Sequence, residues 1–70
     1  MVMTYLEARE FEARDLVRVC GTASAAKEKL NEDHAGLISL YESGNREPWV
    51  SFAYKDYVTI HGFLSQMEVD

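Results

Sequence analysis

Residues 36–42 (GLISLYE), 49–54 (WVSFAY) and 57–63 (YVTIHGF) decide the fold that this sequence predicts. β-Branched and aromatic residues, which favour strands, fill all three runs. Residues 43–48 (SGNREP) separate the first two runs, and Lys55-Asp56 separates the last two, as turns separate strands. The pattern therefore predicts an antiparallel sheet with strands at 37–42, 49–54 and 57–62.

The predicted sheet is apolar on both faces. A tight turn at Lys55-Asp56 places Tyr54 and Tyr57 on one face, whereas Trp49 falls on the other. Each face then needs a cover or a partner, because one short helix can shield a single face. Residues 1–20 could supply the second cover, or a different loop could shift the register; the sequence leaves both open.

Residues 22–33 are predicted to form a helix that Thr22 caps, because threonine after Gly21 is a favoured N-cap. Three small or apolar residues lie on one face at helical spacing: Ala23, Ala26 and Leu30. Gly36 is expected to end this helix in a left-handed conformation. The alanine-rich face suits close packing against the sheet.

The first twenty residues are ambiguous. Residues 7–15 are rich in helix formers, and Glu10 and Arg14 form an i,i+4 pair. A long helix would gather four residues on one face: Leu6, Ala13, Val17 and Cys20. Residues 16–20 (LVRVC) instead read as a short buried strand that ends before Gly21. We favour the strand there, so the expected fold is a single α+β domain over residues 1–70, with the order β(β)αβββ.

Length and cysteine content narrow the class of protein. A chain of 70 residues buries about 60% of its unfolded surface, so its core is thin. Its one cysteine, Cys20, forms no internal disulfide, which fits a reducing cytoplasm. A signal peptide is not expected, and no apolar run approaches the roughly 20 residues that cross a bilayer.

The net charge of −5 indicates the kind of partner to expect. Twelve acidic and seven basic residues disfavour contact with the phosphates of nucleic acid. An acidic surface suits a partner whose own surface is basic, such as a machine that handles nucleic acid. The alternative is that mild acidity keeps a small protein soluble.

The sequence offers little chemistry for catalysis. Cys20 lies in an apolar run, which is typical of a structural rather than a nucleophilic cysteine. His34 and His61 are too distant from Cys20 in sequence to indicate a zinc site. No glycine-rich phosphate loop is present. We therefore expect a non-enzymatic protein without a metal or cofactor.

Two families resemble parts of the chain. Residues 21–30 (GTASAAKEKL) resemble the first helix of a Cro/repressor-type helix-turn-helix, and residues 37–48 resemble the end of its recognition helix. That resemblance implies a DNA-binding transcriptional regulator. Residues 33–41, however, hold no Lys, Arg, Gln or Asn to contact bases or phosphates.

The second resemblance is to small type I anti-CRISPR proteins of phages. Residues 24–27 (SAAK), 36–41 (GLISLY) and 49–55 (WVSFAYK) carry it. It implies a protein in the cytoplasm of a bacterial host that binds and inhibits a CRISPR effector complex. We take this as the expected function, and the helix-turn-helix regulator as the alternative.

Six residues are the candidate contacts with a protein partner: Glu28, Glu32, Asp33, Trp49, Tyr54 and Tyr57. The acidic side chains would face a basic surface, and the aromatic ones would supply most of the buried area. The competing interpretation places Trp49 in the core. Neither direct binding of nucleic acid nor binding to a membrane is expected, and a homodimer is left open.

Overall fold

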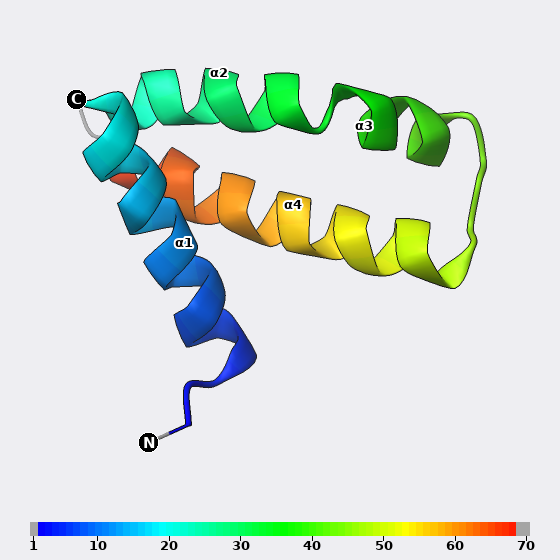
Figure 1. The fold of residues 1–70 in the computed structure, drawn as a ribbon, viewed down its shortest axis with the longest axis horizontal. Helices are drawn as coiled ribbons and strands as arrows, with labels where there is room; N and C mark the ends of the chain where they lie inside the picture. The colour runs from blue at the N-terminus through cyan, green and yellow to red at the C-terminus, as the bar shows by residue number, and fades with distance from the viewer. Residues whose placement is uncertain (1, 69–70) are drawn as a thin grey trace.

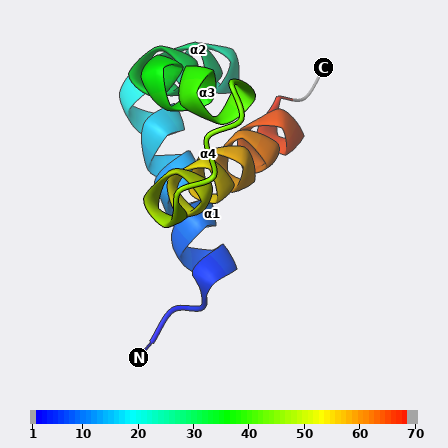
Figure 2. The ribbon, with the colours of Figure 1, turned by 90° about the vertical axis from the view of Figure 1, so that its right-hand side faces the viewer.

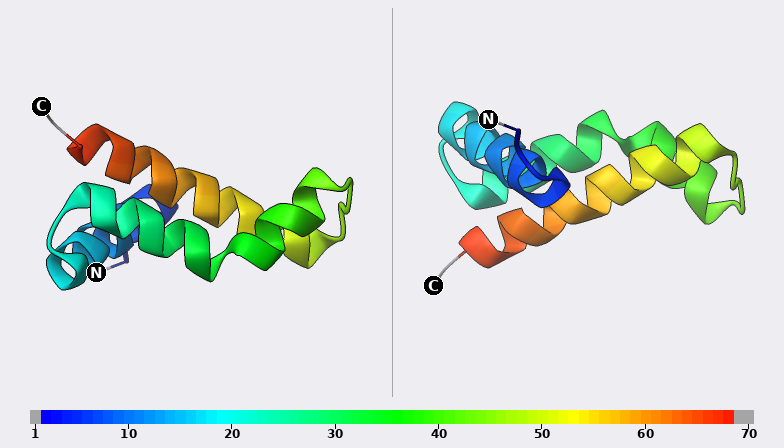
Figure 3. Two further views of the ribbon diagram at one scale, coloured as in Figure 1. Left: turned by 90° about the horizontal axis from the view of Figure 1, so that it is seen from above. Right: turned by 90° about the horizontal axis from the view of Figure 1, so that it is seen from below.

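The computed structural model describes residues 2–68, which form four helices (Figure 1). The helices are α1 (Tyr5–Cys20), α2 (Ala23–Asp33), α3 (Ala35–Glu42) and α4 (Pro48–Met67). Helices α2 and α3 follow one another along one side, and α4 returns beside them in the opposite direction (Figures 1 and 3). Helix α1 crosses one end of this pair and contacts α2 and α4.

The α+β prediction is wrong, because the described part of the chain contains no strand. Residues 37–42 lie in α3, and residues 49–54 and 57–62 both lie in α4. The predicted turn at Lys55-Asp56 is the middle of α4, and residues 16–20 are the last turn of α1 rather than a strand. The order β(β)αβββ is therefore replaced by four consecutive helices.

Helical spacing explains why α4 forms. Its inward residues recur at intervals of three and four: Val50, Ala53, Tyr57, Ile60, Leu64 and Met67. This period buries one face of a helix, and it coexists with the short alternations that suggested strands. Pro48 occupies the first turn, where its missing N–H costs nothing. Thr59, which is β-branched, donates its hydroxyl to the carbonyl of Lys55 one turn earlier, at 2.8 Å.

Helix α1 has defined signals at both ends. Thr4 and Glu7 form a capping box, in which each side chain accepts a hydrogen bond from the other residue's backbone N–H. Glu10 and Arg14 form the predicted i,i+4 pair, at 2.9 Å. Gly21 ends the helix with φ of 96°, a conformation that side chains disfavour. The helical alternative for residues 7–15 is therefore correct, and it extends to Cys20.

Helix α2 matches its prediction. It spans Ala23–Asp33, and the hydroxyl of Thr22 accepts a hydrogen bond from the N–H of Ala25 at 3.1 Å. Gly36 does not end it: that residue lies inside α3 and has no positive φ. A single residue, His34, separates the two helices.

The predicted turn after residue 42 is present, but it joins helices α3 and α4 rather than two strands. Gly44 adopts φ of 101°, and its N–H and that of Asn45 bond to carbonyls of α3. Arg46 donates to the carbonyl of Tyr41 at 2.7 Å. These bonds satisfy the end of α3 while the chain reverses toward α4, as Figure 2 shows end-on.

The core lies where α1, α2 and α4 meet. Five buried residues form it: Ala13, Ala26, Leu30, Ile60 and Leu64. Alanine on α1 and on α2 lets both helices approach α4 closely. Half-buried residues such as Leu16, Val17 and Cys20 pack around this cluster. Helix α1 makes no comparable contact with α3, so one end of the α3–α4 pair lacks a third helix.

Truncating a side chain in the core should lower the stability of the fold. We expect Leu64→Ala, at a side chain with 0% exposure, to lower the free energy of unfolding by about 2–5 kcal/mol. Urea unfolding followed by circular dichroism measures this change. Phe52→Ala is the control, because that ring is 69% exposed, and it should change stability by less than about 0.5 kcal/mol. Equal losses from both variants would contradict this core.

Candidate functional site

A groove lies between α1, α2 and α4. Its volume is about 400 Å³, within the usual range for ligand sites. Its apolar wall consists of Leu16, Leu30, Ala53 and Ile60. Its polar lining consists of Glu12, Asp15, Asp33, His34 and Asp56. Four carboxylates therefore border an apolar surface.

Trp49 lies on the same face of α4 as the residues that line the groove. Ala53, Asp56 and Ile60 line the groove, and Trp49 precedes Ala53 by one helical turn on the same face. Trp49 lies toward the part of α4 that α1 does not cover, and its side chain is 57% exposed. Its indole N–H donates to Glu47 at 2.8 Å. The interpretation that placed this ring in the core is therefore wrong.

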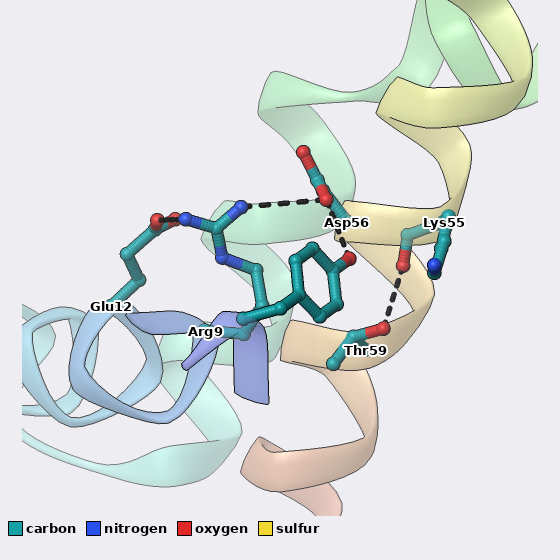
Figure 4. A network of polar contacts seen from close by, with 6 residues as sticks. Arg9, Glu12, Lys55, Asp56 and Thr59 are labelled. Carbon is teal, nitrogen blue, oxygen red and sulfur yellow. Dashed lines mark hydrogen bonds and ion pairs between the residues drawn. The ribbon is translucent and has the colours of Figure 1, made fainter. Parts of the chain in front are cut away.

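Arg9 organises the carboxylates nearest to the N-terminal part of α1. Its guanidinium lies between Glu12 and Asp56 and pairs with both, as Figure 4 shows. The hydroxyl of Tyr5 donates to the same Asp56 carboxylate at 2.5 Å. This bond raises the pKa of Tyr5, because ionisation would lose it. Arg9 and Tyr5 thus fix Asp56 in place and tie α1 to α4.

The other two carboxylates pair with more exposed cations. Asp15 pairs with Arg18 one turn along α1, and Asp33 pairs with Lys29 at 3.2 Å on α2. Hydrogen bonding to Asp33 raises the pKa of Lys29. The Arg18 and Lys29 side chains are both more than half exposed, and solvent screening makes such exposed pairs weak. Neither pair therefore contributes much to stability.

The structure separates the predicted acidic residues. Asp33 lines the groove. Glu28 and Glu32 are exposed and lie on the face of α2 away from buried Ala26 and Leu30. The three residues therefore do not form one acidic surface, as their closeness in sequence had suggested.

Tyr54 and Tyr57 belong to an aromatic stack that holds the helices together. The Tyr54 ring stacks on Tyr41 of α3, with centroids 3.8 Å apart, and Arg46 covers the other side of Tyr41 at 3.7 Å. The Tyr57 hydroxyl donates to Asn31 of α2 at 2.5 Å. Burial raises the pKa of Tyr57. Tyr54 and Tyr57 both make contacts within the chain. Of the three aromatic residues predicted to contact a partner, Trp49 therefore has the ring most accessible to another molecule.

Sequence reasoning missed Glu12, Asp15 and Asp56 as members of one site. Asp56 was assigned to a turn, and the other two were not distinguished from the remaining acidic residues of the chain. A helical reading of residues 48–67 would have placed Asp56 on the same face as Ala53 and Ile60. No sequence signal shows that α1 crosses there.

The described residues contain no group of three or more His, Cys, Asp or Glu side chains arranged to hold a metal ion. Cys20 is half-buried and packs against the core. His34 and His61 lie beside the Tyr57 ring, with centroids 5.5 and 5.8 Å from it. What the groove brings together is a set of carboxylates beside apolar side chains.

Helices α2 and α3 do not have helix-turn-helix geometry. That motif sets two helices at about 90–120° across a turn of three or four residues. Here His34 alone separates α2 from α3, and the two helices run end to end (Figure 1). Helix α3 (AGLISLYE) also carries no basic side chain. This arrangement gives no support to the alternative of a DNA-binding regulator.

No family model matches this sequence, and comparison with curated proteins and with solved structures gives no match either. Among residues 2–68, none of the helices has the length and apolar character needed to span a membrane.

The bond between Tyr5 and Asp56 should give stability that alkaline pH removes. The folded-state pKa of Tyr5 is raised, so the contribution is complete below the unfolded value of about 10 and disappears as pH rises through the folded-state pKa. At pH 7 we expect Tyr5→Phe to lower the free energy of unfolding by about 0.5 kcal/mol, a small loss because the bond is exposed. Urea unfolding of both proteins from pH 7 to pH 11 measures the difference, which should shrink with pH. A difference independent of pH would contradict this role.

Proposed function

We propose that this chain is a non-enzymatic protein-binding protein whose groove accepts a basic, partly apolar segment of a protein partner. The observation that carries the proposal is the groove itself, in which four carboxylates border apolar side chains. Side chains of lysine and arginine have matching parts, an aliphatic stem and a charged end. The stem would lie against Leu16 and Ala53, the half-buried part of the apolar wall, while the charged end meets a carboxylate.

Asp15 and Asp33 are the carboxylates best placed to receive the partner's cations. Asp56 is already held by Arg9 and Tyr5, whereas Arg18 and Lys29 are exposed and their pairs are weak. At Asp33, an arginine of the partner can bind the carboxylate through two parallel hydrogen bonds, which the exposed Lys29 cannot match. At Asp15, it would compete with Arg18, whose side chain is 76% exposed. Exchange of the chain's own cations for those of the partner would therefore favour binding.

Trp49 would supply the apolar anchor of the same surface. It lies on the groove's side of α4 and is more than half exposed. Tryptophan and arginine are the residues that most often dominate binding energy at protein interfaces. Of the six contacts that the sequence predicted, this proposal keeps one acidic residue, Asp33, and one aromatic residue, Trp49.

The finer prediction is that the partner is a nucleic-acid-handling complex that this protein inhibits. Such complexes present basic surfaces to phosphates, and an acidic protein bound there would compete with nucleic acid. A CRISPR effector in the cytoplasm of a bacterial host is the specific partner that the sequence resemblance implies. The resemblance included a sheet that the structure does not contain. The proposal of a CRISPR effector as partner is therefore supported only by the carboxylates that border the groove.

Matched double variants test the groove. The probe is a short peptide of alternating arginine and leucine, and fluorescence of Trp49, the chain's one tryptophan, reports its binding. We expect Asp15→Asn with Asp33→Asn to weaken the peptide about tenfold, because two charge contacts are lost. Glu28→Gln with Glu32→Gln removes the same charge from the outer face of α2 and should weaken it less than about twofold, by screened long-range attraction.

A peptide of alternating glutamate and leucine is the control for charge, and it should not bind. Circular dichroism of both double variants checks that the fold is kept. The proposal is contradicted if the basic peptide fails to bind, or if the two double variants lose affinity equally.

The isolated protein should not bind nucleic acid. Its net charge is −5, and α3 offers no basic side chain to phosphates. We expect no shift of duplex DNA in a gel at physiological salt. A specific shift that weakens with added salt would instead support a direct DNA-binding role.

A further inference from the structure

His34 lies at the single-residue junction between α2 and α3, where its half-buried side chain lines the groove. Among the described residues that line the groove, it is the only histidine. Histidine is the side chain whose charge ordinarily changes between pH 5 and pH 8. The contacts proposed above for a basic segment do not use it.

Two contacts hold the His34 ring in place. Its Nδ1 atom lies 2.8 Å from the carbonyl oxygen of Leu30, one turn earlier on α2. A carbonyl oxygen only accepts hydrogen bonds, so Nδ1 carries a proton and donates it to this bond. The ring also lies beside Tyr57 of α4, with centroids 5.5 Å apart. In the neutral ring Nε2 is then the nitrogen without a proton, and acidification adds a positive charge there.

Charged groups of three helices surround this position. Four carboxylates line the groove with His34: Glu12 and Asp15 on α1, Asp33 on α2, and Asp56 on α4. Three cations of the chain already pair with them: Arg9, Arg18 and Lys29. Helix α4 adds the titratable side chains of Tyr54, Tyr57 and His61 around the same aromatic cluster. The titratable residues of α3, Tyr41 and Glu42, lie in its last turn, away from His34.

The balance of these charges depends on His34. Four negative and three positive side chains leave an excess of one negative charge at the groove while the His34 ring is neutral. A protonated His34 cancels that excess. It also places a cation of the chain directly after Asp33 in sequence, where the charged end of a partner's side chain is expected to bind.

We propose that His34 regulates the groove by pH, so that a basic segment binds while the ring is neutral and is weakened when the ring is protonated. This regulation rests on the proposed function of the groove. The protonated ring repels the partner's cations and competes with them for the carboxylates. Aspartate and glutamate side chains ordinarily stay ionised until the pH falls below about 5, so the carboxylates keep their charge while histidine gains its own.

Calorimetric titration with the peptide of alternating arginine and leucine tests the role of His34. We expect the wild type to bind the peptide about fivefold more weakly at pH 5.5 than at pH 7.5. His34→Gln should bind almost equally at both values. His61→Gln is the matched control, because that ring also lies beside Tyr57 but does not line the groove, and it should keep the wild-type dependence. Equal pH dependence in the two variants would overturn the proposal.

A titration of the unaltered chain gives a second test that does not depend on how His34→Gln folds. Coupling between two binding events is reciprocal, so the bound peptide should lower the pH at which His34 takes up its proton, by about 0.7 for a fivefold effect. NMR of the two histidine rings, with and without saturating peptide, measures this change. His61 should move much less, and an unmoved His34 would contradict the regulation.

The outcomes separate this regulation from the function on which it rests. Absence of peptide binding at pH 7.5 contradicts the basic-segment groove, and the regulation with it. Binding that is equally strong at pH 7.5 and pH 5.5 contradicts the role of His34 alone and leaves the groove supported.

Discussion

The fold depends on the contact between two alanines and one face of α4. Ala13 on α1 and Ala26 on α2 are fully buried, and both pack in the cluster that contains Ile60 and Leu64. A methyl group lets two helix backbones approach closely, so a short chain can join three helices with few large side chains. Larger residues at either position would force α1 or α2 away from α4 and open the core.

So small a core leaves much apolar surface outside it. Large apolar side chains such as Phe11, Trp49 and Phe52 stay more than half exposed, because three helices of this length cannot enclose them. The angle at which α1 crosses the α2–α4 pair also leaves the groove. The proposed contact with a basic segment uses surface that the core could not cover.

The error in fold class has a specific physical origin. Residues 49–63 satisfy strand propensity and also place apolar residues at helical spacing, and short apolar runs do not distinguish the two. The outcome depends on Lys55-Asp56. Lys-Asp is not a preferred pair for a two-residue hairpin turn, and the helix that begins at Pro48 runs through both residues to Met67. Gly36 and Gly62 lie within helices, since glycine weakens a helix without necessarily ending it.

Local signals in the sequence by themselves determined α2, its cap at Thr22, the Glu10–Arg14 pair and the acidic character of the surface. These depend on residues within a few positions of each other. Tertiary structure alone decided that Glu12, Asp33 and Asp56 border one groove, that Tyr54 stacks on Tyr41, and that Trp49 stays exposed. Those relations depend on how α1 crosses α4, and that crossing is set by the packing of buried residues from three separate helices.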